Sequence, residues 1–428
     1  MNRINELIQK LCPDGVEYKK LEEVFVLKNG YTPSKSNPDY WNDGTVPWFR
    51  MEDIRKNGRI LNKAIQNVTE KAVKKLKFPS NSLIVATTAT IGEHALIECD
   101  FLCNQQLTCI TIKDKYKDKL SIKYCFYYFD IIDELCKKIA NQSGGMPIVS
   151  LSKMRELSIP VPPLEVQREI VRVLDSFTLL TAELTAELTA RKKQYEYYRE
   201  YLLNKNSHEV QKKKLGEIFE FRNGLSKGKD FFGKGIPFVK YTDVYNHRKL
   251  KKENITALVD CTPEEMQKLK VSRGDVFFTR TSETAEDVGW SSVMLDDMEE
   301  CVFNGFTIKA TPKTTDLLPE YCAYCFSTDS FRKYVTSHCA FTTRASLTGK
   351  TIAEYEMPIP SHKIQKRIAE TLDNFETICN DLNIGLPAEI EARQKQYEFY
   401  RNLLLTFAET GDIIAQTDRQ TDRQTSNN

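Results

Sequence analysis

The amino-acid sequence predicts the α+β class: a tandem pseudo-symmetric duplication, with two mixed α/β domains separated by two long antiparallel coiled-coil helices. Three observations predict this architecture. Blocks of sequence recur once, in the same order, roughly 200 positions apart. Within each copy, strand-like runs alternate with amphipathic helical segments. Each copy then ends in a long segment whose apolar residues follow a heptad pattern.

Four pairs of matching blocks define the duplication. The copies agree only at framework positions of the globular parts and agree more closely in the helical parts. We therefore expect two divergent surfaces on one repeated scaffold. The pairs are Lys19-Lys20-Leu21 with Lys213-Lys214-Leu215, Val46-Pro47-Trp48-Phe49-Arg50 with Ile236-Pro237-Phe238-Val239-Lys240, Ile159-Pro160-Val161-Pro162 with Met357-Pro358-Ile359-Pro360, and Lys193-Gln194-Tyr195-Glu196 with Lys395-Gln396-Tyr397-Glu398.

The matches divide the chain into six expected parts. Each copy consists of a globular domain followed by a helix, and the two copies are flanked by short end segments. The parts are an N-terminal segment (1–17), a first globular domain (18–160), a first spacer helix (161–206), a second globular domain (207–360), a second spacer helix (361–408) and a disordered polar tail (409–428).

The globular domains contain both kinds of secondary structure. Ser82–Ala86 and Asp275–Phe278 are apolar runs bounded by turn residues, which predicts buried strands. Tyr124–Ala140 and Tyr321–Val335 have helical periodicity, which predicts one amphipathic helix in each domain.

The first spacer helix is expected to run from Pro163 to Asn204, about 63 Å at the α-helical rise, because no Gly or Pro interrupts it. Its apolar stripe must be buried against another long helix, and the segment from Ser361 to about Ala408 supplies one. Gly385-Leu386-Pro387 predicts a break in that second helix, with Pro387 in the first turn of a new segment.

Composition places the chain among ordinary globular proteins. The net charge is +2, with a basic stretch between Lys212 and Lys252 and an acidic group between Asp296 and Glu300. No apolar run is long enough to span a membrane, and Met1 to Lys10 lack the pattern of a secretory signal. We therefore expect a cytoplasmic protein.

The cysteine spacing and the candidate catalytic motifs give little support for a metal site or an enzymatic activity. Cys322 and Cys325 have zinc-like spacing, but without a second such pair packing is the better interpretation. Asn37-Pro38-Asp39-Tyr40 resembles the Asn-Pro-Pro-Tyr signature of amino-methyltransferases, but a surface turn fits it better. A phosphate loop, a His-Glu-x-x-His helix and a clear nuclease-like group of acids are absent from the sequence. The prediction is no catalytic residue, no cofactor and no metal.

Two helical motifs resemble those of a known family. Thr-Ala-Glu-Leu is repeated within residues 181–190 and is followed by Arg191-Lys192-Lys193-Gln194-Tyr195, while the second copy carries Gly385-Leu386-Pro387-Ala388-Glu389. With Leu11-Cys12-Pro13-Asp14-Gly15-Val16 near the start, these motifs resemble the specificity (S) subunit of type I restriction–modification systems, particularly its IC subfamily. The likeness covers nearly the whole chain.

The resemblance implies a non-catalytic subunit that reads DNA. In this family the globular units are target-recognition domains, and each reads one half of a bipartite, asymmetric site. The helices form a spacer that docks two methyltransferase (M) subunits, to which motor–nuclease (R) subunits are added. Double-stranded DNA and these subunits are therefore the expected partners, and no membrane is involved.

The family also uses the number of Thr-Ala-Glu-Leu copies to set the unread spacer between the half-sites. Helix geometry agrees with this role. One four-residue copy adds about 6 Å and a net rotation of about 40°. One base pair adds about 3.4 Å and about 35°, so an extra copy keeps two readers in phase with the DNA.

Candidate DNA contacts lie in polar loops of the globular domains. Arg or Lys suits guanine and Asn or Gln suits adenine, whereas Arg50 and Lys240 align between the copies and suit phosphates. Arg280 and Arg344 have no equivalent in the first copy and are the sharper candidates for base contact. The predicted DNA-binding residues are Arg50, Thr87, Thr88, Thr90, Gln105, Gln106, Asn141, Gln142, Lys240, Thr279, Arg280, Thr281, Thr342, Thr343 and Arg344.

Two pairs of residues are weaker candidates. His94 and His338 could contact DNA, although a lone histidine is more often structural. Asn104 and Asn304 align between the copies, which suits a shared turn better than base reading.

Two other functions stay open at this point. The chain could be a DNA adenine methyltransferase fused to a recognition domain, in which case it would methylate DNA alone. It could instead be a coiled-coil interaction protein that binds without regard to DNA sequence.

Overall fold

The computed structural model describes residues 2–141, 146–205 and 210–410 and divides into two compact units. Unit 1 comprises Met1–Glu183 and Glu391–Asn428, and unit 2 comprises Leu184–Ile390. The predicted DNA contact Gln142, the expected domain start at 207 and most of the expected tail lie outside the described residues.

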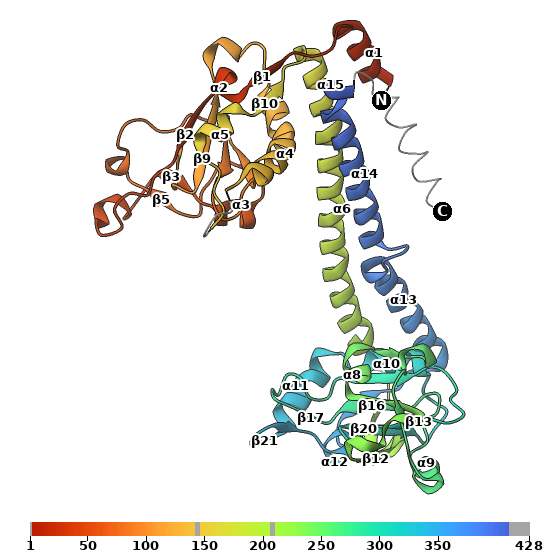
Figure 1. The fold of residues 1–428 in the computed structure, drawn as a ribbon. Helices are drawn as coiled ribbons and strands as arrows, with labels where there is room; N and C mark the ends of the chain where they lie inside the picture. Colours follow the sequence, from red (N-terminus) through yellow and green to blue (C-terminus); the bar gives the residue numbers. More distant parts are fainter. Residues whose placement is uncertain (1, 142–145, 206–209, 411–428) are drawn as a thin grey trace. The chain divides into compact units, whose positions relative to one another are not determined.

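The core of unit 1 is a five-stranded sheet with the order β2-β9-β6-β7-β4, and helix α4 (Ile122–Ile139) packs against it (Figure 1). Its pairs are antiparallel except for β4 with β7. The predicted strand Ser82–Ala86 is confirmed as β6, which is buried along its whole length. The other strands are β2 (Phe25–Asn29), β4 (Ile60–Leu61), β7 (His94–Ile97) and β9 (Leu107–Ile112).

Two smaller sheets complete unit 1. A three-stranded sheet has the order β5-β3-β8, and a two-stranded sheet pairs the first and last strands of the globular part. The strands are β1 (Tyr18–Lys20), β3 (Val46–Phe49), β5 (Asn67–Val68), β8 (Leu102–Cys103) and β10 (Ser158–Pro160), and the short helices are α2 (Leu21–Val24), α3 (Met51–Asn57) and α5 (Leu151–Glu156).

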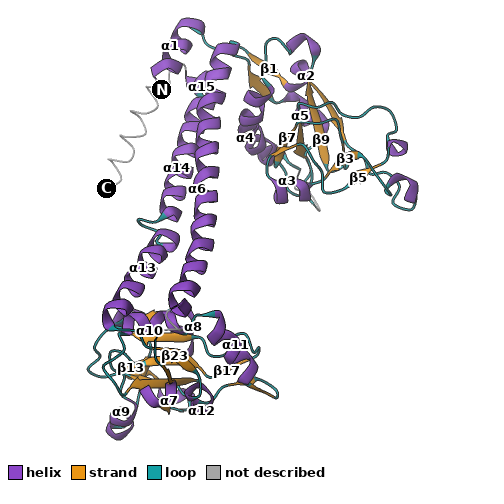
Figure 2. Cartoon of the chain, turned by 180° about the vertical axis from the view of Figure 1, so that it is seen from behind, coloured by secondary structure: helices purple, strands orange, loops and turns teal. Residues whose placement is uncertain are grey.

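Unit 2 repeats the three sheets with equivalent strands in equivalent order, β12-β20-β16-β18-β14, β15-β13-β19 and β11-β23. This agreement of order and direction confirms the tandem duplication, and the strands are drawn in orange in Figure 2. The strands are β11 (Lys212–Lys214), β12 (Phe219–Asn223), β13 (Phe232–Val239), β14 (Lys249–Leu250), β15 (Leu258–Val259), β16 (Val276–Thr279), β18 (Ser291–Met294), β19 (Val302–Phe303), β20 (Thr307–Pro312) and β23 (Glu356–Pro358).

Among its described residues, unit 2 also has a fourth sheet and six short helices. The additional sheet is three-stranded, with the order β17-β22-β21. The elements are β17 (Thr281–Ser282), β21 (Ala340–Phe341), β22 (Ala345–Ser346), α7 (Leu215–Ile218), α8 (Tyr241–Asn246), α9 (Pro263–Leu269), α10 (Pro319–Cys325), α11 (Asp329–His338) and α12 (Gly349–Ala353).

The prediction of a single helix over Tyr321–Val335 was wrong. The structure has two helices here, α10 and α11. The Thr328 side chain accepts a hydrogen bond from the backbone N–H of Phe331, which caps a new helix start and stops α10 from continuing.

The predicted break in the second helical region is confirmed. The first region is one continuous helix, α6 (Leu164–Lys205), whereas the second is divided into α13 (His362–Asn380), α14 (Leu386–Leu405) and α15 (Phe407–Thr410). Pro387 is in the first turn of α14, where a proline costs no helical hydrogen bond.

Each unit buries its own part of these helices. In unit 1 the rings of Phe177 on α6 and Tyr400 on α14 stack with centroids 5.4 Å apart. In unit 2 the rings of Tyr198 on α6 and Phe375 on α13 stack at 5.7 Å. Later residues of α6 therefore meet earlier residues of the second region, as antiparallel pairing requires.

The N-terminal segment contains a helix that was not predicted, α1 (Asn2–Leu11). Ile4 and Ile8 are buried in the same core as Leu404 and Phe407, near the other end of the described chain. Only these few apolar positions mark the helix, so its burial depends on residues almost 400 positions away and cannot be read locally.

The sequence pair Asn29-Gly30 recurs as Asn223-Gly224 in the second copy, and the structure gives this recurrence a steric cause. A Cβ atom on Gly30 would lie 2.2 Å from the carbonyl oxygen of Cys103, and one on Gly224 would lie 2.2 Å from that of Asn304. In both units the chain leaving the first sheet strand passes directly over backbone atoms, and only glycine leaves the space.

We expect Gly224→Ala to destabilise the protein by at least roughly 1–3 kcal/mol, because the added methyl group meets immovable backbone. Gly228→Ala is the matched control, since nothing lies within 4 Å of its Cβ position. Urea denaturation of both variants measures the difference. Equal stability of the two variants would contradict the close approach of Gly224 to the backbone of Asn304.

Candidate nucleic-acid interface

A cavity of about 540 Å³ in unit 1 collects several predicted DNA-binding residues. It is bounded by the end of β3, the turn between β8 and β9, and the loop after β2. Arg50, Gln105 and Gln106 line it, together with Lys35 and Gln66. Amide and cationic side chains therefore converge on one hollow, and these are the groups that read base edges and hold phosphates.

Two tryptophans form an aromatic wall in this cavity. The rings of Trp41 and Trp48 meet edge to face with centroids 5.1 Å apart, and both indole N–H groups donate to backbone carbonyls of the loop after β2. The Arg50 guanidinium lies 5.5 Å from the centre of the Trp48 ring and 3.1 Å from Glu52. These contacts hold the arginine in place at the cavity. Trp41 was not among the predicted residues, although its segment Asp39-Tyr40-Trp41 has a counterpart in Asp230-Phe231-Phe232 of unit 2, where the rings of Phe232 and Phe238 stack with centroids 5.4 Å apart.

Unit 2 has two neighbouring cavities at the equivalent place. Lys240, which follows β13, lines a cavity of about 550 Å³. Arg280 and Thr281 line another of about 320 Å³. Asn304 contributes to both. The fold thus brings four predicted or aligned residues of this unit together.

Asn104 and Asn304 form the shared turn that their alignment predicted. The backbone N–H of each donates to the last residue of β3 or β13, at 3.1 and 2.9 Å. The side-chain oxygen of Asn104 accepts from the N–H of Gln106 at 3.2 Å, and that of Asn304 accepts from the N–H of Phe306 at 2.6 Å. The turn presents two glutamines in unit 1 and an exposed phenylalanine in unit 2.

A second cluster in unit 1 joins Thr88 and Thr90 to Asn141. Isolated bridges pair Ile148 with both Thr88 and Asn141. Between the threonines, Ala89 has a φ of 63°, an uncommon conformation for a residue with a Cβ. The hydroxyl oxygens of Thr88 and Thr90 are buried and lack a hydrogen-bond partner among the described residues. Strain and unsatisfied groups of this kind are typical of functional loops.

In unit 2 the equivalent cluster is built on the additional sheet. Arg280 directly precedes β17, which begins at Thr281. Strand β22 pairs with β17 and with β21, so that Thr342, Thr343 and Arg344 form the turn of the β21–β22 hairpin. All three turn residues are exposed.

Thr87 and Thr279 do not suit the predicted DNA contact. Both side chains are buried, with 6% and 0% of their surface exposed. The Thr87 hydroxyl donates to the carbonyl of Gln106, and that of Thr279 donates to the carbonyl of Asp287. Thr87 directly follows the buried strand β6 and Thr279 is the last residue of β16, so both side chains point into their units and support the loops that follow.

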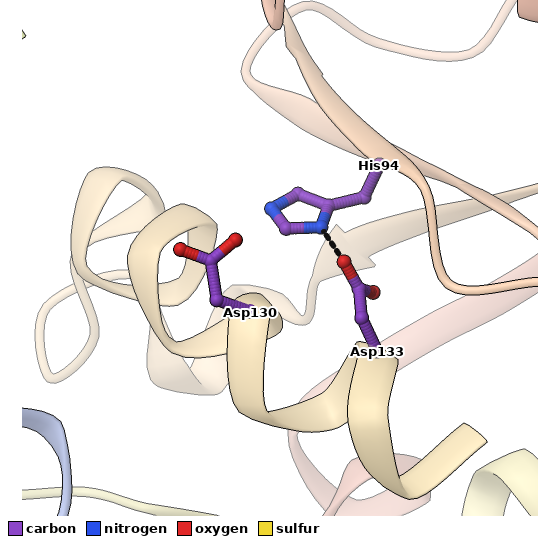
Figure 3. A group of neighbouring side chains, drawn as sticks. All are labelled: His94, Asp130 and Asp133. Carbon is purple, nitrogen blue, oxygen red and sulfur yellow. Dashed lines mark hydrogen bonds and ion pairs between the residues drawn. The ribbon is translucent and has the colours of Figure 1, made fainter. Parts of the chain in front are cut away.

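His94 is a structural residue, and the proposal that it contacts DNA is corrected by its burial. Figure 3 shows its ring between α4 and the sheet, hydrogen-bonded to Asp133. Its other nitrogen lies 2.8 Å from the carbonyl oxygen of Phe126. Burial raises the pKa of the Asp133 carboxyl, and the hydrogen bond with His94 works against that rise.

His94, Asp130 and Asp133 are three residues of metal-ligating types whose ligand atoms lie within 4.8 Å of one another. Two arginines already supply the positive charge that balances the Asp130 carboxylate. Arg59 lies 2.7 Å from one oxygen of Asp130, and Arg401 on α14 lies 3.5 Å from the other. The group therefore ties α4 to the sheet and to α14 as an ion-pair network.

Three other sequence features have structural roles. Cys322 and Cys325 are buried in the core of unit 2, and burial raises the pKa of Cys322 to about 12, which disfavours the thiolate that a metal needs. His338 ends α11 and stacks on Tyr334 with centroids 4.2 Å apart. Asn37 caps a short surface turn by accepting from the N–H of Asp39, which confirms the turn interpretation.

A second polar network fixes the reading domain of unit 2 to its own helices. Arg248, before β14, lies 2.7 Å from Glu376 on α13 and 2.6 Å from the Tyr195 hydroxyl on α6. The Tyr324 hydroxyl lies within hydrogen-bond distance of the carboxylates of Asp373 and Glu376, to either of which it can donate its one hydrogen. Burial, followed by the bond to Asp373, raises the pKa of Tyr324, so its hydroxyl remains a donor.

We expect Asn304→Ala to lower the free energy of unfolding by about 1 kcal/mol, because the turn loses the acceptor for the Phe306 N–H. Asn304→Asp keeps an acceptor oxygen and is expected to retain stability within roughly 0.5 kcal/mol. Chemical denaturation compares them. A stable Asn304→Ala variant with altered base preference would instead make Asn304 a reader.

Known proteins match the chain over both halves. The family model for the type I restriction modification DNA specificity domain matches twice, at residues 13–191 and 207–392. The EcoprrI specificity subunit of Escherichia coli is 48% identical over 233 residues, which cover 51% of this chain and 58% of that protein. The EcoR124I/EcoR124II specificity subunit of Escherichia coli is 32% identical over 304 residues, which cover 68% and 72%.

Two solved structures share the fold. The HsdS subunit from Thermoanaerobacter tengcongensis has a TM-score of 0.57 and 18% identity, and the match covers 92% of this chain and 97% of that one. A chain from a structure titled for complex assembly and conformational transition of the type I R-M system also has a TM-score of 0.57, with 16% identity and coverage of 93% and 97%. With two copies of the family domain spanning most of its length, the chain belongs to the type I restriction–modification DNA specificity family.

Proposed function

We propose that this chain is the non-catalytic subunit that gives a type I restriction–modification complex its DNA specificity, and that it binds a bipartite, asymmetric site. One observation carries the proposal: two copies of one fold present different side chains at equivalent positions. Arg280 stands in unit 2 where Thr87 stands in unit 1, and Gln106 faces the cavity where unit 2 has Phe306. A repeated fold with unlike surfaces suits the reading of two unlike half-sites.

The direct contacts proposed here are the polar residues of the two clusters that are at least partly exposed. In unit 1 they are Arg50, Gln105, Gln106, Thr88, Thr90 and Asn141, and in unit 2 they are Lys240, Arg280, Thr281, Thr342, Thr343 and Arg344. Gln142 belongs to the same proposal but lies outside the described residues.

Partner subunits would dock on the helical regions. Leu179 and Tyr197 on α6 are 61% and 63% exposed, and Leu382 and Ile384 between α13 and α14 are 72% and 78% exposed. Large apolar side chains that face solvent in this way often mark protein interfaces. We assign these positions to methyltransferase subunits, with the motor–nuclease subunits joining the assembled core and the complex acting in the cytoplasm. Among the described residues, no helix combines the length and apolarity that a bilayer crossing requires.

Co-expression with the cognate methyltransferase subunit, followed by genome-wide mapping of modified adenines, tests this function. We expect a two-part motif with a fixed gap, and no methylation by this chain alone. Methylation by the purified chain would make it an enzyme in its own right. If the complex binds DNA without sequence preference, the chain would instead be a coiled-coil interaction protein.

Deleting Thr185–Leu188, one Thr-Ala-Glu-Leu copy, is expected to shorten the unread gap by about one base pair, because the helix loses about 6 Å and about 40° of net rotation. The deletion lies within the uninterrupted helix α6. The double substitution Thr185→Ala with Thr189→Ala is the control, since it keeps the length and a good helix former. Mapping of modified adenines measures the gap. An unchanged gap after the deletion would show that the length of α6 does not set the distance between the half-sites.

A further inference from the structure

The additional sheet of unit 2 gives this unit a structured ribbon. Strands β21 and β22 form a hairpin, Ala340–Ser346, which we name the reading ribbon. At the equivalent place, the described part of unit 1 has only the isolated bridges to Ile148. The ribbon lies beside Arg280 and the cavity that Arg280 lines.

The base of the reading ribbon is fixed in the core. Ala345 is fully buried, and Leu347, directly after the ribbon, is 1% exposed in the same hydrophobic cluster. The backbone N–H of Leu347 donates to the carbonyl of Arg280 at 2.8 Å, and Thr281 is in register with Ser346. A ribbon anchored in this way offers its tip in a defined orientation, which reduces the entropy lost on binding.

The tip of the ribbon is exposed and polar. Phe341 is 61% exposed, and Thr342, Thr343 and Arg344 are also exposed. The turn closes through the N–H of Thr342, which lies 3.4 Å from the carbonyl oxygen of Arg344. No hydrogen bond or ion pair joins the Arg344 guanidinium to any residue that the structure describes. All five of its N–H donors are thus available to a ligand.

The shape and chemistry of the ribbon fit the DNA major groove. That groove, about 12 Å wide, admits a two-stranded β-ribbon. Arginine is the side chain that pairs bidentately with O6 and N7 of guanine, and a threonine methyl group can contact thymine. At the base of the ribbon, Arg280 and Lys227 line a common cavity. Lys227 is paired with Glu265 at 2.8 Å, so Arg280 is the residue that supplies positive charge for a flanking phosphate.

We propose that the reading ribbon enters the major groove of the half-site bound by unit 2, and that Arg344 donates two hydrogen bonds to one guanine there. This assignment rests on the proposed function. It makes Arg344 a specificity-determining residue for one base pair of one half-site, while Arg280 positions the ribbon on the phosphate backbone.

The test uses the full chain in complex with its methyltransferase subunit. The motif of the wild-type complex is mapped first. Binding is then measured on duplexes that carry each single base-pair substitution, and on duplexes with 7-deazaguanine, which lacks the N7 acceptor. For the wild-type complex, we expect 7-deazaguanine at one position to weaken binding roughly 5- to 150-fold.

Arg344→Ala is expected to bind the native site more weakly and to lose discrimination at that one position, so that 7-deazaguanine there no longer matters. Arg344→Lys keeps the charge but loses the planar fork, and is expected to show reduced discrimination with nearly unchanged salt dependence. Lys333→Ala, an exposed lysine on α11, is the control for general electrostatics and should retain full discrimination.

Three results would overturn the inference. Arg344→Ala could weaken binding equally on all sequences and reduce the salt dependence, as a phosphate contact would. It could leave binding unchanged, or its relaxed position could fall in the half-site that unit 1 variants such as Gln106→Ala affect. In each of these three results the wild-type complex still binds DNA sequence-specifically, so the proposed function would stand. Failure of the proposed function would instead appear as a wild-type complex without a bipartite motif.

Discussion

The structure depends on one uninterrupted helix whose apolar side chains are buried in two separate cores. Val166, Ile170 and Leu174 of α6 belong to the core of unit 1, and Leu203 belongs to the core of unit 2. Neither part can slide along its partner helices without exposing these side chains, at a cost of about 1.5–3 kcal/mol for each. A change in the number of residues between the two groups must therefore be expressed as a change in length and rotation.

Each reading domain is also held to its own helical segment by charge. In unit 1, Asp130 on α4 lies between Arg59 and Arg401. In unit 2, the two carboxylate oxygens of Glu376 contact the Arg248 guanidinium and the Tyr324 hydroxyl. Such partly buried pairs contribute more to defined geometry than to net stability. Defined geometry is what a reader requires, since base contacts allow little displacement.

Sequence patterns predicted the features that depend on local chemistry. The strand Ser82–Ala86, the duplication and the break before Pro387 all follow from periodicity, turn residues and proline sterics. Features that depend on distant contacts were missed. Helix α1 is buried in a core that includes Leu404 and Phe407 at the far end of the described chain, and a Thr328 side-chain cap divides a helix whose periodicity looked continuous.

The site was predictable by residue type and only partly by position. Arg50 and Gln106 were found from their chemistry, and the structure places both on one cavity. Burial decided the other cases. Thr87 and Thr279 have suitable hydroxyl groups, but each ends a central strand and turns inward. Gln66 reaches the same cavity from a separate loop that no sequence pattern joins to it, whereas Trp41 could have been found from its alignment with Phe232.

The interruption between α13 and α14 gives the molecule mechanical compliance on one side. In the segment Asp381–Gly385 the Asp381 carboxylate accepts from the backbone N–H groups of Asn383 and Ile384, so the connection is a compact turn that is independent of helical phase. When α6 gains or loses a few residues, the opposite side can follow by adjusting this joint. If the second helical region were one rigid helix, it would need a length change to match that of α6. A single insertion or deletion in one half of the gene would then not be enough to change the spacing.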